Sequence, residues 1–342
     1  IASYLSNHSS RPWSRHTRRI LVPLDGSPFG DSAIGYATAI ARRSGAMIEL
    51  IHVHVPHHID GNLFTVTPYM YEGVLDVDVE LDHEILRREL ESLRERALLL
   101  GEETDLTVTA RLVTGRVDTA VEHEAEEFHA DLIVMATHAR SGFARARMGS
   151  VADAVVRQAT MPVLLVRPPE NFTEASLCPN LHHVLIALDG SPFSEQILEP
   201  AADLARLCEA DVSLVHVEVP HGERTILGMK AGEAALEKMR EVSEHYLQQL
   251  AATNSELFEQ PQLKAVVATY PAAAIVDAAR ECEAGLIAMA THGRGGLTRL
   301  ILGSTANEVL IQSPVPVLLY RPRVGAEAGQ TTETEAAQTR SN

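Results

Sequence analysis

The sequence is poor in features that mark several large classes of protein. Aromatic residues make up 4% of its 342 residues, and no apolar run reaches the roughly 18–20 residues that a membrane-spanning helix requires. Positive charge is also scarce, because 29 lysines and arginines stand against 46 aspartates and glutamates, a formal net charge of −17. Such a charge repels phosphate backbones and anionic lipid, so we expect no nucleic-acid partner and no membrane partner.

Cysteine is equally rare, with Cys178, Cys208 and Cys282 widely spaced and without a C-x-x-C pattern. An odd, scattered set of this kind predicts neither a disulfide framework nor a zinc site, and it fits reduced thiols in the cytoplasm. The sixteen histidines contain no H-x-x-x-H helix and no mixed Cys/His cluster, so no metal site is indicated. His52 and His216, which fall inside strand-like runs, are expected to be satisfied core histidines.

The sequence also lacks the common catalytic motifs. It contains no G-x-x-x-x-G-K-[ST] loop, no G-x-S-x-G elbow and no pair of carboxylates that a motif places for magnesium-assisted transfer. We therefore expect no dedicated catalytic residues.

What the sequence does contain is an internal repeat. The stretch Ile20-Leu-Val-Pro-Leu-Asp-Gly-Ser-Pro-Phe29 returns 164 residues later as Val184-Leu-Ile-Ala-Leu-Asp-Gly-Ser-Pro-Phe193. Further along, Met135-Ala-Thr-His-Ala-Arg140 returns 154 residues later as Met289-Ala-Thr-His-Gly-Arg294. The first copy therefore carries about ten extra residues, which we place between Pro56 and Asp82, a stretch rich in loop formers.

Each copy predicts an α/β domain. Short β-branched runs alternate with longer segments of helical period, which is typical of βαβ units around a parallel sheet. The spacing of Leu86, Leu90 and Leu93 predicts a long helix packed on that sheet. In the first copy the expected strands are 20–24, 47–53, 108–113, 132–136 and 163–166.

The repeat and the composition of the intervening segments predict the domain boundaries. Residues 169–182 follow Pro168 and contain further prolines among polar residues, as a linker does. The expected order is an N-terminal tail over 1–18, a first domain over 19–168, the linker, a second domain over 183–323 and a disordered tail over 324–342. Each domain would end in an apolar edge strand, and pairing of these two strands would join the domains as an intramolecular pseudo-dimer.

The most informative motif follows the fourth expected strand of the second copy. It reads Ala290-Thr-His-Gly-Arg-Gly-Gly-Leu-Thr-Arg-Leu-Ile-Leu-Gly-Ser-Thr305. A glycine loop between a strand and a helix lets backbone N–H groups approach an anion, and the helix dipole adds positive potential there. The alternative without a ligand is a glycine turn followed by a serine helix cap.

This motif resembles the G-x2-G-x9-G-[ST] phosphate-binding motif of the universal stress protein family, and the similarity extends over both copies. The resemblance implies two Rossmann-like domains of the adenine nucleotide alpha hydrolase-like type, each with a five-stranded parallel sheet flanked by helices. It also implies an ATP site, with or without magnesium. In the second copy the residues matched to that site are Ala187, Asp189, Val217, Ala290, His292, Gly293, Arg294, Gly303, Ser304 and Thr305.

The first copy departs from the motif at one informative position. Ala139 stands where the second copy has Gly293, and a methyl group there would cost about 1–2 kcal/mol in a left-handed conformation. A weaker site is therefore expected in this copy, formed by Pro23, Asp25, Val53, His138, Arg140, Gly149, Ser150 and Val151. Asp25 and Asp189 have an alternative structural role, because Asp-Gly-Ser-Pro is a strong turn sequence by itself.

Three functions are compatible with these observations. The leading one is an ATP-binding stress or regulatory protein that holds nucleotide mainly in its second domain, with slow ATP hydrolysis as the most turnover expected. The second is a nucleotide-free dimerising scaffold of the same fold. Assembly of the chain into homo-oligomers is compatible with either function. The third, an ATP-pyrophosphatase type of enzyme, is disfavoured because the loop from Asp25 to Ser32 lacks that family's paired glycines.

Overall fold

A computed structural model of the chain describes residues 17–27, 30–55, 71–137, 148–167, 180–220, 232–291 and 302–321, with the backbone alone for 71–82. The first half contains β1 (Arg19–Leu24), α1 (Asp31–Ser44), β2 (Met47–His54), α2 (Tyr71–Thr104), β3 (Val108–Thr114), α3 (Val117–Glu127), β4 (Leu132–Ala136), α4 (Ser150–Gln158) and β5 (Val163–Val166). The second half contains β6 (His183–Leu188), α5 (Pro192–Glu195), α6 (Leu198–Cys208), β7 (Asp211–Glu218), α8 (Glu233–Thr253), β8 (Gln262–Val267), α9 (Pro271–Glu281), β9 (Leu286–Ala290), α10 (Ser304–Gln312) and β10 (Val317–Tyr320).

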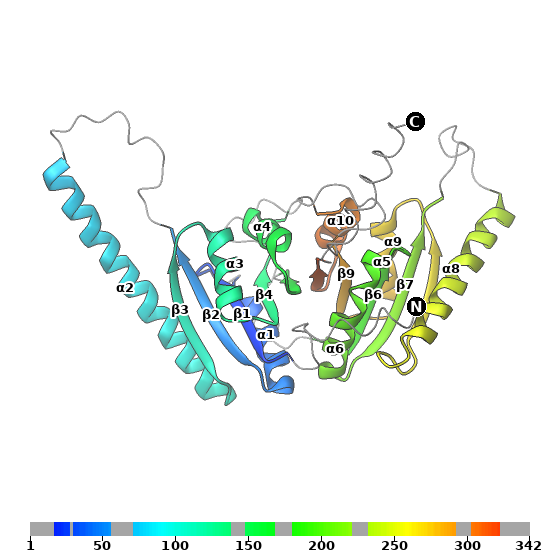
Figure 1. Cartoon of the computed structure of the whole chain (residues 1–342), viewed down its shortest axis with the longest axis horizontal. Coiled ribbons are helices and arrows are strands. Elements are labelled where there is room, and N and C mark those ends of the chain that lie inside the picture. Colours follow the sequence, from blue (N-terminus) through cyan, green and yellow to red (C-terminus); the bar gives the residue numbers. More distant parts are fainter. Residues whose placement is uncertain are drawn as a thin grey trace, which may run out of the picture.

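All of the strands belong to a single ten-stranded sheet with the order β3-β2-β1-β4-β5-β10-β9-β6-β7-β8 (Figure 1). Within each half the neighbouring strands are parallel. The two halves meet where β5 pairs antiparallel with β10, with Leu164 opposite Leu318. The predicted α/β class and the tandem repeat are thus confirmed, and the final strand of each half has the other as its neighbour.

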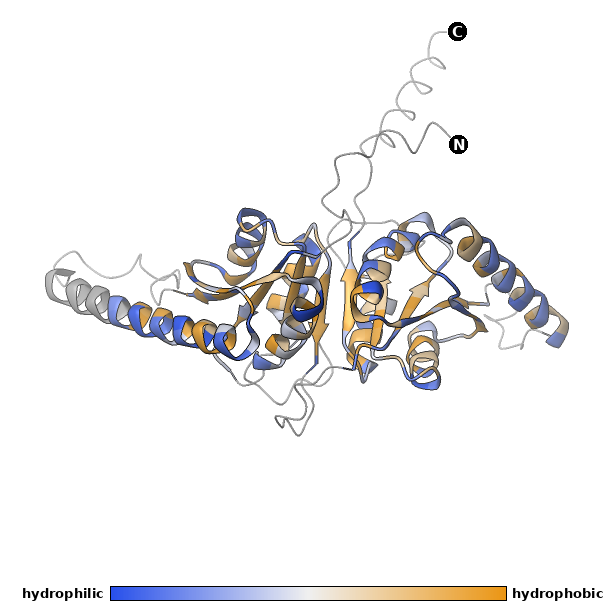
Figure 2. Cartoon of the chain, turned by 90° about the horizontal axis from the view of Figure 1, so that it is seen from below, coloured by the Kyte–Doolittle hydropathy of each residue, from blue (hydrophilic) through white to orange (hydrophobic). Residues whose placement is uncertain are grey.

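Helices cover both faces of this sheet. One face packs against α1, α2, α6 and α8, and the other packs against α3, α4, α9 and α10. Because both faces are covered, the central strands β5 and β10 are buried at every position, and Figure 2 shows the hydrophobic residues gathered along the strands. Each of the two hydrophobic cores contains residues from both halves.

The contacts between the halves are reciprocal. Arg167, just after β5, donates to the backbone oxygen of Ile311 in α10, and Arg321, just after β10, donates to the backbone oxygen of Arg157 in α4. Helix α1 of the first half also packs against its counterpart α6 of the second. The two halves therefore contact each other through equivalent residues.

The largest difference between the halves lies in their long helices. Helix α2 has 34 residues, whereas its counterpart α8 has 21. Our expectation that the extra residues of the first copy sit in a loop-forming stretch over 56–82 is therefore wrong for 71–82, which are helical. The prolines of that stretch end at Pro68, so the backbone from Tyr71 onward has every N–H that a helix needs. Among the described residues, no helix is both long and apolar enough to cross a membrane.

Candidate functional site

The candidate site lies at the carboxyl ends of the parallel strands, where open α/β sheets bind their ligands. In each half an aspartate follows the first strand and is held by a turn. The Oδ1 atom of Asp25 accepts hydrogen bonds from the Ser27 backbone N–H at 3.0 Å and the Ser27 hydroxyl at 2.6 Å. Asp189 accepts the same pair from Ser191 at 2.9 and 2.6 Å. The turn role predicted for both aspartates is therefore confirmed, and it fixes their carboxylates at the sheet edge.

Glycine makes this turn possible. Gly26 and Gly190 follow the two aspartates with φ angles of +74° and +78°, a left-handed conformation in which a side chain is strained. Beyond the turn the two serines play the same part, because the Ser191 hydroxyl oxygen accepts from the Ser194 N–H at 3.2 Å and that of Ser27 accepts from the Gly30 N–H at 3.3 Å. Residues 28–29 lie outside the described residues.

Apolar residues of the first two strands border the aspartates. Ala187 is buried, and Val53 and Val217, near the ends of β2 and β7, are each 9% exposed. Pro23 is half-buried in β1. The aspartate and the valine of each half thus lie on adjacent strands at one edge, as the assignment of an adenosine-binding end requires.

The second part of the site is the start of the helix after the fourth strand. Gly149 donates its N–H to the Thr137 oxygen at 3.0 Å, and Gly303 donates to the Thr291 oxygen at 2.9 Å. These bonds bring the first turns of α4 and α10 directly beside the ends of β4 and β9. Both glycines have negative φ angles, −61° and −55°, so a left-handed backbone does not explain why glycine stands there.

Neither helix start is closed by a side chain within the described residues. Gly149 and Gly303 are themselves the N-cap residues, and no side-chain cap bond is formed at either. Ser150 and Ser304 open the two helices with exposed side chains, so Ser304 is not the cap that the ligand-free alternative required. The first N–H groups of each helix, including those of Val151 and Thr305, are therefore oriented as anion-binding donors.

The two helix starts differ in charge, which the sequence comparison had missed. Helix α4 carries Asp153 in its first turn, paired with Arg157 at 2.6 Å, whereas α10 has Asn307 at the equivalent position. A carboxylate near a helix N-terminus interacts with the dipole as a bound anion would, and it repels such an anion. The offset of 154 residues between the copies would have revealed this difference.

The remaining predicted residues of the site cannot be placed. His138, Arg140, His292, Gly293 and Arg294 lie outside the described residues, as do the rest of the two glycine loops. What the structure brings to one edge of the second half is the set of Ala187, Asp189, Val217, Ala290, Gly303, Ser304 and Thr305.

The strand histidines have structural partners. His52 Nδ1 lies 2.9 Å from the Leu24 oxygen, and the ring of the buried His216 contacts that of Tyr246 with centroids 5.0 Å apart. The predicted core position is thus supported for His216, whereas His52 is only half-buried. Over the described part of the chain, no group of three or more His, Cys, Asp or Glu side chains is arranged to hold a metal ion.

Comparison with known proteins identifies the fold and the family. The model of the universal stress protein family matches residues 16–167 and again 180–321. A universal stress protein of Mycobacterium tuberculosis (strain ATCC 25618 / H37Rv) is 28% identical over 91% of this chain and 99% of its own length. Another, from Methanocaldococcus jannaschii, is 30% identical over 49% of this chain and 92% of its own length.

A solved structure agrees with these sequence matches. The crystal structure of a universal stress protein from Archaeoglobus fulgidus DSM 4304 superimposes with a TM-score of 0.58. It covers 89% of this chain and 98% of its own, at 21% sequence identity, so the likeness concerns the fold.

Proposed function

The chain belongs to the universal stress protein family, and on this premise we propose that it is an ATP-binding regulatory protein whose second half holds the nucleotide. The adenosine end would contact Asp189 and Val217, and the phosphates would lie at the start of α10. Gly293, His292 and Arg294 would complete the phosphate loop. Bound nucleotide would stabilise one conformation of the chain rather than serve as the substrate of fast chemistry.

The observation that carries this proposal is the uncapped start of α10. Its first turn has no acidic residue, it begins at Gly303 without a side-chain cap among the described residues, and it lies beside the end of β9. Free N–H groups and the positive end of the helix dipole at such a place favour a phosphate group. The same position in the first half carries Asp153, which supports weaker binding there.

Mass spectrometry of the small molecules released when the purified full chain is denatured tests the proposal directly. The expected result is an adenine nucleotide at about one per chain. A correctly folded protein that releases no nucleotide and takes up no added ATP would refute it.

Calorimetric titration with ATP locates the site. Gly293→Ala is expected to weaken binding about five- to thirtyfold, because a methyl group in the left-handed conformation expected there costs about 1–2 kcal/mol. Asn307→Asp, which gives α10 the acidic residue of α4, should weaken binding by a smaller factor. The matched control Ala139→Gly changes the first half alone and should leave the tight site unaltered. Binding that survives Gly293→Ala unchanged contradicts the assignment.

A second candidate function is a dimerising scaffold that binds no nucleotide, and the join between the halves favours it. We propose that the β5–β10 pairing and the reciprocal Arg167 and Arg321 contacts form an intramolecular pseudo-dimer. The two hypotheses make different predictions. If the chain is a scaffold, removing nucleotide should change neither the pairing of its two halves nor its stability. Nucleotide binding predicts a higher melting temperature in the presence of ATP.

A further inference from the structure

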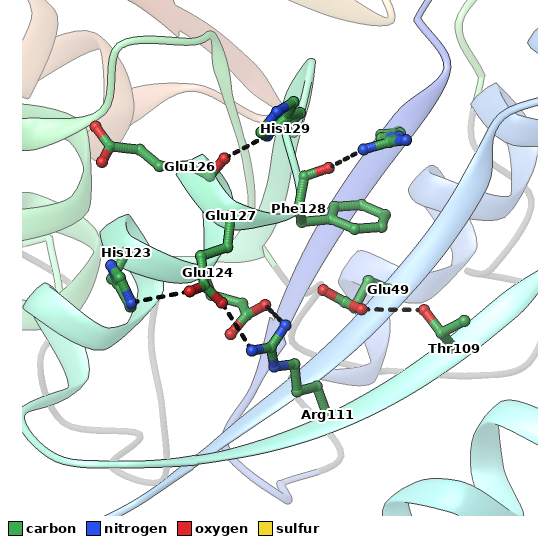
Figure 3. Close-up of polar contacts among 10 residues, drawn as sticks. Glu49, Thr109, Arg111, His123, Glu124, Glu126, Glu127, Phe128 and His129 are labelled. Carbon is green, nitrogen blue, oxygen red and sulfur yellow. Dashed lines mark hydrogen bonds and ion pairs between the residues drawn. The ribbon is translucent and has the colours of Figure 1, made fainter.

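A buried pair of carboxyl groups lies beneath α3 in the first half, remote from the proposed nucleotide site (Figure 3). Glu49 projects from the first part of β2 and is 8% exposed, and Glu124 projects from α3 and is completely buried. Neither residue belongs to the glycine motif or to the turn that holds Asp25. Burying an ionised carboxylate is costly unless it is paired or neutralised, so this pair requires a specific explanation.

The charged groups around Glu124 come from four elements. From β3, the Arg111 guanidinium lies 2.8 Å from Glu124 and 2.7 Å from Glu127, and from β2 comes Glu49 itself. Within α3, Glu127 also pairs with His123 at 3.4 Å. Helix α4, which packs on α3, contributes Asp153 and Arg157, and these pair with each other. Thr109 donates to Glu49 at 3.2 Å.

Within this cluster the guanidinium of Arg111 faces more negative charge than it can neutralise. It is half-exposed and is shared between Glu124 and Glu127. The short contact with Glu124 is an ion pair by distance, but neither oxygen of Glu124 nor Oε2 of Glu49 has a hydrogen-bond partner of acceptable geometry in the described chain. Two carboxyl groups in this position are satisfied when one proton lies between them, as in other carboxyl pairs.

The electrostatic environment of Glu124 acts in the same direction. Burial raises the pKa of its carboxyl above the ordinary value of 4.5, and the charge of Arg111 opposes this effect. The negative charge of the neighbouring Glu49 raises the pKa of Glu124 further, and a proton shared between the two carboxyl groups acts in the same direction.

We propose that Glu49 and Glu124 form a proton-binding site, which holds one shared proton in the folded first half and loosens α3 when that proton is released. The site is a device of the first half alone. By the repeat offsets, Glu49 corresponds to Ser213 and Glu124 to Ala278, which are both buried and carry no charge. The surrounding ion pair is retained, because Lys264 occupies the position of Arg111 and pairs with Glu281, the counterpart of Glu127.

The sign of the pH dependence follows from the raised pKa of Glu124. Below the ordinary value of 4.5 both the folded and the unfolded chain carry the proton, so its contribution to stability is fully present. That contribution is lost as the pH rises through the raised pKa of the folded state, because the buried carboxylate must then ionise. Release of the proton would act first on α3, which packs on α4, the helix that begins at Gly149 and Ser150. The proton site is thus one helix away from the weaker nucleotide site.

Hydrogen exchange of the full-length chain, measured from about pH 4 to 8 and corrected for intrinsic exchange, tests this proposal. In the wild type the opening of α3 amides should increase with pH, by up to about tenfold per pH unit while one proton is being released. The amides of α9 provide an internal reference in the same sample and should show no such rise. Glu124→Gln, which resembles the protonated form, should abolish the dependence in α3.

Two further variants keep the test decisive. The matched control Glu127→Gln removes a half-exposed carboxyl from the same helix and the same arginine, and it should leave the pH dependence of α3 in place. Where Glu124→Gln does not fold, the double substitution Glu49→Ser and Glu124→Ala introduces the residues that the second half already uses. Isotope-edited infrared spectroscopy should detect a protonated carboxyl band that these variants lack. An α3 pH dependence that persists in folded Glu124→Gln or in the double variant, or an equal one in α9, overturns the proposal.

Discussion

The two halves of the chain place equivalent backbones around one sheet but fill several equivalent positions with different chemistry. The strand order, the aspartate turns and the helix starts beside β4 and β9 are the same in both. The charged residues at equivalent positions differ between the halves. Asp153 of the first half corresponds to Asn307 of the second, and Glu49 and Glu124 correspond to Ser213 and Ala278. Apolar packing is therefore common to the two halves, while a few polar substitutions set them apart.

The strongest test of this comparison addresses the feature that the halves share. Leu318, 1% exposed in β10, lies opposite Leu164 of β5 at the join between them. Leu318→Ala should lower the free energy of unfolding by about 2–5 kcal/mol, the usual cost of a cavity in a packed core. Chemical denaturation of the full chain measures the loss.

The reciprocal change Leu164→Ala should cost a similar amount, because the two leucines face each other across a near-symmetric join. Leu263→Ala, at a 40% exposed position on the outer strand β8, is the matched control and should change stability by about 0.5 kcal/mol or less. A small effect of Leu318→Ala would show that the halves fold and persist independently of their pairing.

The fold could be predicted from the sequence because its signals are repetitive and local. Two copies of the same alternation of β-branched runs and helical periods indicate the βαβ order, and Leu164 and Leu318 lie in apolar runs that end each copy. The helical segment 71–82 was missed because the preceding prolines and glycines suggested a loop. Such breakers show where a helix cannot continue, but they do not show where the next one starts.

The candidate site was predictable only in part. Asp25 and Asp189 were assigned to the site through the family resemblance, with a turn role as the alternative, and the structure shows that turn. The pairing of Glu49 with Glu124 was not predicted, because it joins residues far apart in the sequence on β2 and α3. Contacts of this kind depend on strand register and helix packing, which a single sequence does not display.

The next test concerns the place where the chain enters each half. In the second half, the Cβ of an alanine at Gly285 would lie 1.8 Å from the backbone oxygen of Asn180. In the first half, Asp131 occupies the equivalent position, and its carboxylate accepts hydrogen bonds from the backbone N–H groups of Arg18 and Arg19 at 2.8 and 3.0 Å. Gly285→Ala should therefore force the backbone apart and cost about 1–3 kcal/mol, as other overpacked sites do. Thermal unfolding of the full chain measures this.

The first-half partner of this test is Asp131→Gly, which removes two hydrogen bonds without introducing a clash. It should cost about 1–2 kcal/mol, because exposed N–H groups recover part of the loss by binding water. If Gly285→Ala is tolerated without loss, the segment at Asn180 is not packed against β9 as the structure places it.

The smallest expected changes in stability concern the contacts that hold the long helices α2 and α8 against α1 and α5. In the first half Arg96 of α2 pairs with Asp31 of α1, and in the second half the Tyr246 hydroxyl of α8 donates to Glu195 of α5 at 3.0 Å. Arg96 is 38% exposed, so solvent and salt screen its pair, and Arg96→Gln should cost no more than about 0.5 kcal/mol at low salt. Tyr246→Phe keeps the ring contact with His216 but deletes a half-buried hydrogen bond to a carboxylate, so it should cost about 1 kcal/mol.

Denaturation of both variants at low and at high sodium chloride distinguishes the two kinds of contact. The difference between Arg96→Gln and the wild type should vanish at high salt, whereas that of Tyr246→Phe should persist. Equal salt dependence of the two would mean that both helices are attached by charge alone, and the comparison between the halves would fail at this point.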